Sequence, residues 1–147
     1  MKVIIQCVKK ASVTVNNVLI SKINRGYLLL VGIEKDDSED DINWMANKVY
    51  NLRINQDENR KTNLSIKDID GEILSVSQFT LCAKLDGRRP SFSNAAVPNV
   101  AKEMFDKFNA TLENLGVDLK KGCFQEHMEV ELINDGPFTI ICDSKNK

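Results

Sequence analysis

The sequence predicts a single α+β domain over residues 1–147, in which a mostly closed sheet carries two helices on its outside. Three observations predict this class: β-forming runs outnumber helical ones, strands and helices do not alternate regularly, and there is no internal repeat or linker. A chain of 147 residues can bury roughly 68–70% of its unfolded surface, so neither a metal nor a disulfide is needed to hold its core.

The predicted strands lie at both ends of the chain and in its middle. Residues 3–15 and 18–23 are β-rich and meet at Asn16-Asn17, a pair that suits a tight turn. Residues 26–33 are almost continuously apolar, as expected of a strand that is covered on both faces. Further β-rich runs follow at residues 72–83, 127–133 and 138–143.

Two segments have the pattern of amphipathic helices. The first can begin with Ser38 as its N-cap and Asp41 as the acidic partner of a capping box. The second can begin near Pro98, which suits a first helical turn, and end at Gly116, which suits a C-cap. Apolar residues recur at helical spacing in both segments: Ile42, Met45, Ala46 and Val49, then Ala101, Met104, Phe105, Phe108, Leu112 and Leu115.

Composition and charge exclude several classes of protein. With a net charge of −1 and a pI near 5.9, the chain lacks the global basic character of a nucleic-acid-binding protein. Its four cysteines are far apart, which is typical of buried free thiols in a reducing compartment. The apolar run at the N-terminus is too short for a signal peptide or a membrane span. We therefore expect a cytoplasmic protein with no membrane segment.

The inventory of reactive side chains is small. The chain has one histidine, His127, which precedes an alternating strand pattern and is expected to be a surface or structural residue. Nothing in the spacing pairs it with a cysteine, and no set of zinc ligands or glycine-rich phosphate loop is present. We therefore expect no metal and no cofactor. An enzyme with this sequence has to work with hydroxyl, amide and main-chain groups.

The best cluster of such groups is the stretch SQFTL. Strand alternation places Ser77 and Phe79 on one face and Gln78 and Thr80 on the other. One interpretation is a half-buried strand with a polar side. The other is a strand end that presents main-chain N–H groups and the Thr80 hydroxyl to a polar substrate. A threonine without an adjacent base is a poor nucleophile, so main-chain donors are the better candidates for catalysis.

A second unusual segment, NDGP at Asn134–Pro137, separates the last two β-rich runs. Asn-Gly or Asp-Gly alone would serve a hairpin turn. A proline after the glycine removes a backbone donor where the next strand begins. The pattern indicates either a turn whose last residue, proline, is rigid, or a main-chain arrangement whose carbonyl groups face a ligand.

These two segments together resemble the signature segments of the D-aminoacyl-tRNA deacylases, as VSQFTL at Val76–Leu81 and NDGPFT at Asn134–Thr139. The similarity also covers the stretches VIIQ, ASVTV, VGIEKDD, GRRPSFSNAAVP and GCFQEHMEVELINDGP, and so runs almost end to end. It implies a homodimer with a β-barrel-like, mostly antiparallel sheet and two amphipathic helices packed outside. The implied activity is hydrolysis of the ester in D-aminoacyl-tRNA, with no cofactor.

The resemblance also implies roles for individual residues. It places Ser77, Gln78, Phe79 and Thr80 in the catalytic site, and it makes Gly136-Pro137 a substrate-binding element. In the family this Gly–Pro bond is cis, and the loop enters the active site of the other subunit to meet the acceptor end of the tRNA. Its carbonyl groups would reject L-aminoacyl groups by clash but could not exclude glycine, so mischarged glycyl-tRNA would also be cleaved.

Two alternatives remain open at this point, together with one departure from the family pattern. The chain could be a non-catalytic dimeric tRNA-binding module that uses local basic groups (Arg88, Arg89, Lys120 and Lys121). It could also be a related deacylase with shifted specificity. Cys7 stands where many members of the family carry an arginine that helps to hold the Gly–Pro loop, which leaves the support of the loop unassigned.

Overall fold

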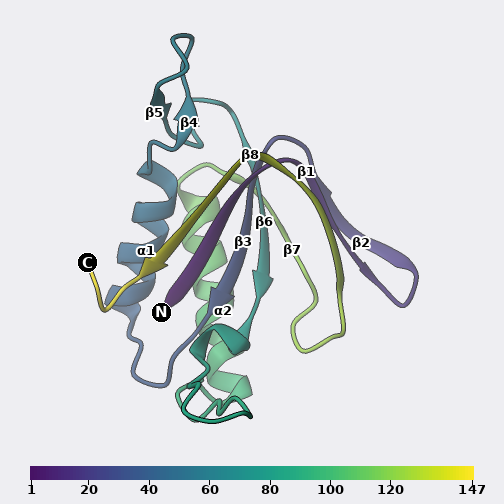
Figure 1. The fold of residues 1–147 in the computed structure, drawn as a ribbon, viewed down its shortest axis with the longest axis vertical. Coiled ribbons are helices and arrows are strands. Elements are labelled where there is room, and N and C mark those ends of the chain that lie inside the picture. Colours follow the sequence, from purple (N-terminus) through teal and green to yellow (C-terminus); the bar gives the residue numbers. More distant parts are fainter.

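The computed structural model describes residues 1–147 as one α+β domain (Figure 1). A six-stranded sheet curls into a nearly closed barrel, and two long helices pack beside each other on its outer face. A hydrogen bond of 2.8 Å from Ser21 Oγ to the Lys121 carbonyl joins strands at the two ends of the sheet. In chain order the elements are β1 (Lys2–Val15), β2 (Val18–Ile23), β3 (Gly26–Gly32), α1 (Glu39–Asn51), β4 (Asn55–Gln56), β5 (Thr62–Leu64), β6 (Glu72–Ser77), the 3₁₀ helix η1 (Phe79–Cys82), α2 (Pro98–Asn114), β7 (Asp118–Lys121) and β8 (Glu129–Asp143).

The sheet is mixed, so the expectation of a mostly antiparallel sheet needs correction. The long strand β1 pairs antiparallel with β2, as the predicted turn at Asn16-Asn17 implies, and it also pairs antiparallel with β3 and β8. In contrast, β3–β6 and β6–β7 are parallel pairs. The reason is topological, because α1 lies between β3 and β6 and α2 lies between β6 and β7. Each helix serves as a crossover that returns the chain to the same end of the sheet.

The structure confirms the turn and the helix ends that the sequence predicts. Asn16 and Asn17 have φ values of 48° and 63° and join β1 to β2 in the left-handed conformation that tight hairpins require. The Ser38 N–H and hydroxyl both donate to the Asp41 carboxylate, at 2.9 Å each, at the start of α1. Gly116 follows the end of α2 with φ of +100°.

The apolar residues form two separate cores. The larger lies between the sheet and the two helices and contains Tyr27, Met45 and Phe108, all fully buried. The smaller fills the inside of the barrel and includes Val13, Leu28, Leu74 and Val76. β3 contributes to both cores, as expected of a strand covered on both faces. None of the helices has the length and apolar character that crossing a membrane requires.

Two segments differ from the predicted strands. β6 ends at Ser77, and the following residues wind into η1, so simple strand alternation does not hold for SQFTL. The last two runs are one continuous strand, β8, and not a hairpin. Because β8 pairs with β1 on both sides of the Gly–Pro segment, the chain cannot reverse there. The short strands β4, β5 and β7 were not predicted, since runs of two to four residues give little periodic signal.

Candidate functional site

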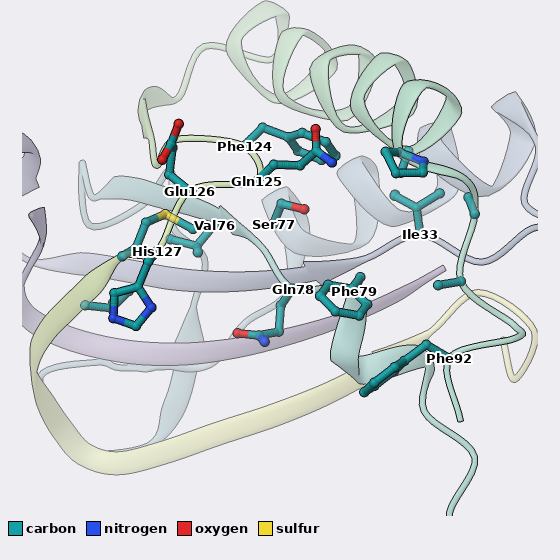
Figure 2. A pocket seen from close by; sticks show the side chains of 16 residues that line it. Ile33, Val76, Ser77, Gln78, Phe79, Phe92, Phe124, Gln125, Glu126 and His127 are labelled. Carbon is teal, nitrogen blue, oxygen red and sulfur yellow. The ribbon is translucent and has the colours of Figure 1, made fainter. Parts of the chain in front are cut away.

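A pocket of about 650 Å³ opens between the end of β6, the beginning of α2 and the segment that precedes β8 (Figure 2). Sixteen residues line it, and ten of them are hydrophobic. The polar groups are few and lie at the wall and the rim, which is the usual composition of a site for a small organic group. The pocket therefore has the size and lining for an aminoacyl group, with polar atoms to fix its orientation.

The predicted segment from Ser77 to Thr80 forms one wall of this pocket. Ser77, Gln78 and Phe79 line it directly. The Gln78 N–H donates to the Val31 carbonyl at 2.7 Å, which anchors the turn on β3. The Gln78 side-chain amide donates to Thr80 Oγ1 at 2.5 Å, so these two side chains interact as a pair. Thr80 itself is exposed and is not part of the lining.

The main chain of η1 is held close to β3. A Cβ atom on Gly32 would lie 2.9 Å from Leu81 Cβ and 3.2 Å from the Gln78 carbonyl oxygen, so glycine allows this approach. The first bond of the turn runs from the Leu81 N–H to the Gln78 carbonyl at 3.2 Å. The N–H groups of Phe79 and Thr80 precede this bond and have no acceptor within the turn. They belong to the SQFTL stretch, whose main-chain N–H groups are the candidate catalytic donors predicted from the sequence.

The other predicted segment is not part of this pocket. Asn134–Pro137 is exposed throughout and lies in the interior of β8. The pairing of β1 with β8 jumps from Gln6–Thr139 to Val8–Asn134, so residues 135–138 face Cys7 alone. Gly136 has φ of +139°, and the Gly136–Pro137 bond is cis, as the resemblance implied. Neither residue lines the pocket of its own chain.

The opposite wall of the pocket was missed by the sequence analysis. It comes from Phe124–Met128, which includes the lone histidine, His127. The Gly122 N–H donates to the Ser75 carbonyl at 2.9 Å, which ties this segment to β6 just before it reaches the pocket. His127 is exposed at the rim, in agreement with its prediction as a surface residue. No local pattern indicates that this segment faces the SQFTL stretch.

Cys7 and Cys82 are not activated nucleophiles. Burial raises the pKa of Cys7 to about 11, and burial also raises the pKa of Cys82 to about 11. Cys82 lies in η1 and its thiol donates to the Ile33 carbonyl at 3.4 Å. Both thiols are therefore neutral near pH 7, and a neutral thiol is a weak nucleophile. All four cysteines are free, and no group of three or more His, Cys, Asp or Glu residues is arranged to hold a metal ion.

Comparison with known proteins gives consistent matches over the whole chain. A family model described as D-Tyr-tRNA(Tyr) deacylase matches residues 4–143. D-aminoacyl-tRNA deacylase of Flavobacterium psychrophilum is 52% identical, covering 100% of this chain and 99% of the relative. The enzyme of the same name from Dictyoglomus turgidum is also 52% identical, covering 99% of this chain and 94% of the relative.

Solved structures give the same fold. The c-Myc DNA Unwinding Element Binding Protein superposes with a TM-score of 0.93 at 38% identity, covering 97% of this chain and 98% of that one. A structure titled as a probable eukaryotic D-amino acid tRNA deacylase superposes with a TM-score of 0.85, covering 96% and 97%. The second pair is only 17% identical and so supports the fold alone.

These matches first define a class, the ester hydrolases that act on aminoacyl-tRNA. Within this class the chain belongs to the D-aminoacyl-tRNA deacylase family. The resemblance drawn from the two signature segments is thereby confirmed, and so is the expected enzyme class.

Proposed function

We propose that this protein hydrolyses the ester between a D-amino acid and tRNA, in the pocket walled by Ser77, Gln78 and Phe79. The observation that carries the proposal is a largely apolar pocket beside the unpaired main-chain donors of η1, in a chain of this family. The products are free tRNA and a D-amino acid. Four free cysteines fit a reducing compartment, and we place the enzyme in the cytoplasm, where tRNA is charged.

The Phe79 and Thr80 N–H groups are the proposed catalytic donors. They would bind the ester carbonyl oxygen as it gains negative charge, and the loss of one such donor commonly lowers kcat by about 10²–10³. Water adds to the carbonyl carbon, the bond from this carbon to the ribose oxygen breaks, and the ribose oxygen takes a proton. The vicinal ribose hydroxyl of the substrate assists the attacking water. Gln78 and Thr80 orient the ester and form no covalent intermediate.

We further propose that the enzyme is a homodimer and that Gly136-Pro137 of one subunit enters the pocket of the other. Two features support this arrangement. The Gly–Pro segment is exposed and separate from its own pocket. In addition, β8 pairs only with β1, so its outer edge is free, and it exposes Ile133 and Ile141, the latter at 74%. An unpaired edge with exposed apolar side chains is readily covered by a second chain.

The same arrangement accounts for chiral selection. If the amino group of the substrate is held by main-chain carbonyls of Gly136 and Pro137, the two enantiomers direct their side chains differently. The side chain of an L-residue would meet this rigid wall, whereas that of a D-residue would leave the pocket. Glycine has no side chain to clash, so mischarged glycyl-tRNA is a proposed second substrate.

The test is release of amino acid from matched substrates. Purified enzyme is incubated with D-Tyr-tRNA, L-Tyr-tRNA and Gly-tRNA, and the remaining esterified tRNA is measured over time. We expect rapid loss of the D-ester and the glycyl ester and none of the L-ester above the spontaneous rate. No D-specific release at micromolar enzyme contradicts the proposed activity. Hydrolysis of a small L-aminoacyl-tRNA in preference to the D-ester would instead indicate a deacylase with shifted specificity.

A further inference from the structure

The cationic side chains of a loop beside the pocket form no ion pair within the chain. Residues 81–101 carry three cations, Lys84, Arg88 and Arg89, but only one carboxylate, Asp86, although the whole chain has a net charge of −1. All three cations are exposed. None of them takes part in an ion pair within the chain. Their charge is therefore available to an external anion.

This basic loop, Lys84–Ser91, is held in a defined position next to the pocket. Lys84 and Ser91 exchange two main-chain hydrogen bonds of 2.8 and 3.0 Å, which close the neck of the loop. The chain that follows is tied to the end of β3, because the Ala96 N–H donates to the Ile33 carbonyl at 3.0 Å. Ile33 and Ala96 both line the pocket. The cations are thus carried by a loop that is followed directly by residues of the pocket wall, Phe92, Ala95 and Ala96.

An exposed aromatic pair connects the basic loop to the pocket. The rings of Phe79 and Phe92 are in edge contact, with centroids 4.9 Å apart and planes inclined by 68°. Both line the pocket, yet 54% of Phe79 and 37% of Phe92 remain exposed (Figure 2). Exposed rings beside a cationic groove are the usual platform for single-stranded nucleic acid, because every base can stack on them.

The other rim of the pocket has the opposite charge character. There the pocket is bordered by Glu126 and His127, on the side away from Phe92 (Figure 2). The Glu126 carboxylate is exposed and repels phosphate. For a polynucleotide whose terminal ester occupies the pocket, the charges therefore favour an exit across Phe92 and over the basic loop.

We propose that the basic loop binds the phosphates of the nucleotides that precede the esterified end of the tRNA, with Arg88 and Arg89 as the principal contacts and Phe92 beneath a base. This inference rests on the proposed function for the identity of the ester in the pocket. The basic loop would contact phosphates that a tRNA has and a short ester lacks, and so would favour tRNA as the substrate. It also explains how a chain without a global basic character engages RNA, since a few unopposed cations suffice for a brief contact.

The experiment compares two substrates that share the ester but differ in phosphates. The variant Arg88→Gln/Arg89→Gln is assayed with D-Tyr-tRNA and with the D-tyrosyl ester of adenosine, which has no phosphate. The matched control is Arg60→Gln/Lys61→Gln, two adjacent exposed cations between β4 and β5, at the other end of the long axis of the molecule (Figure 1).

We expect the ratio of kcat/KM for tRNA to that for the adenosine ester to fall roughly tenfold in the Arg88/Arg89 variant, mainly through KM, and to stay constant in the control. The slope of log kcat/KM against log salt for tRNA should decrease by about 1.4, or about 0.7 for each single-strand phosphate that the variant leaves without a cation. Equal decreases on both substrates, no decrease on either, or a change in oligomeric state in the variant would each overturn the proposal.

Binding of uncharged tRNA separates failure of this inference from failure of the proposed function. If the unmodified enzyme hydrolyses neither ester, the proposed function fails. In that case weaker binding of uncharged tRNA by the Arg88/Arg89 variant than by the control still supports the loop as an RNA contact. Equal binding of uncharged tRNA by both variants overturns it.

Discussion

The two signature segments differ in how the fold treats them. Ser77–Thr80 lies at the end of the buried strand β6 and is anchored on β3, and its first three residues form one wall of the pocket. Asn134–Pro137 is exposed in the middle of an otherwise regular strand and does not line this pocket in its own chain. The first segment therefore contributes to a pocket of its own chain. The second has an unusual backbone conformation but contributes to no site described in its own chain.

This contrast places the two parts of the proposed function in different segments. In that proposal the main-chain donors for the ester belong to η1, directly after β6, whereas the chiral filter would come from a second subunit. Selection and catalysis can then be damaged separately. Three variants test this contrast, and their expected effects on activity decrease in the order given.

Gly136→Ala should have the largest effect on activity. Gly136 has φ of +139°, which L-residues rarely adopt, and an added Cβ would lie 2.8 Å from the Phe138 nitrogen. The Gly–Pro segment must shift, and displacement of a positioning group by about 1 Å can lower the rate about 10²-fold. We expect a loss of kcat/KM for D-Tyr-tRNA of this size. Because the site is exposed, the thermal midpoint should change little.

The matched control is Gly116→Ala, which also places alanine at positive φ (+100°) but has open space around it and is not among the pocket residues. It should leave the activity intact. Mixing the Gly136→Ala protein with a variant whose own pocket is blocked, Ala101→Trp, then tests the cross-subunit arrangement. Heterodimers would regain one intact site, so activity should recover to roughly a quarter of that of the unmodified enzyme. No recovery after subunit exchange contradicts the shared site.

Thr80→Ala should have a smaller effect. Its hydroxyl accepts a hydrogen bond from the Gln78 amide, but Thr80 is exposed and has no adjacent base. Loss of one net hydrogen bond of about 1 kcal/mol lowers kcat/KM by about fivefold. Single-turnover deacylation measures this. Complete loss of activity in a folded variant would mean that the hydroxyl attacks the ester, and the mechanism proposed above would be wrong.

Cys7 should have the smallest effect, although it lies opposite the Gly–Pro segment. Burial raises its pKa to about 11, so at pH 8 only about one thiol in a thousand is ionised. Iodoacetamide at pH 8 should leave Cys7 unmodified in the folded enzyme and modify it after unfolding, as mass spectrometry of peptides can show. Cys7→Ser should change kcat/KM by less than about threefold. Rapid labelling of Cys7 in the native protein would contradict its burial.

Much of the local structure was predictable from the sequence, because its signals are local. The Asn16-Asn17 hairpin, the Ser38–Asp41 capping box and the end of α2 just before Gly116 depend on neighbours within a few residues. The two signature segments could also be recognised as short stretches. What could not be predicted was the end of β6 at Ser77, because strand alternation and a 3₁₀ turn are alike over so few residues.

The amino-acid sequence alone was therefore enough to predict the fold class, both helices and the two signature segments of the family. Tertiary structure decided three things: the parallel pairing of β3, β6 and β7, the second pocket wall at Phe124–Met128, and the separation of Gly136 from the pocket of its own chain. Each depends on contacts between residues far apart in the chain, which periodicity and turn chemistry do not encode. The strand β8 is the clearest example. Its sequence resembles a hairpin, but because it pairs with β1 on both sides of the Gly–Pro segment, it is one continuous strand with that segment exposed.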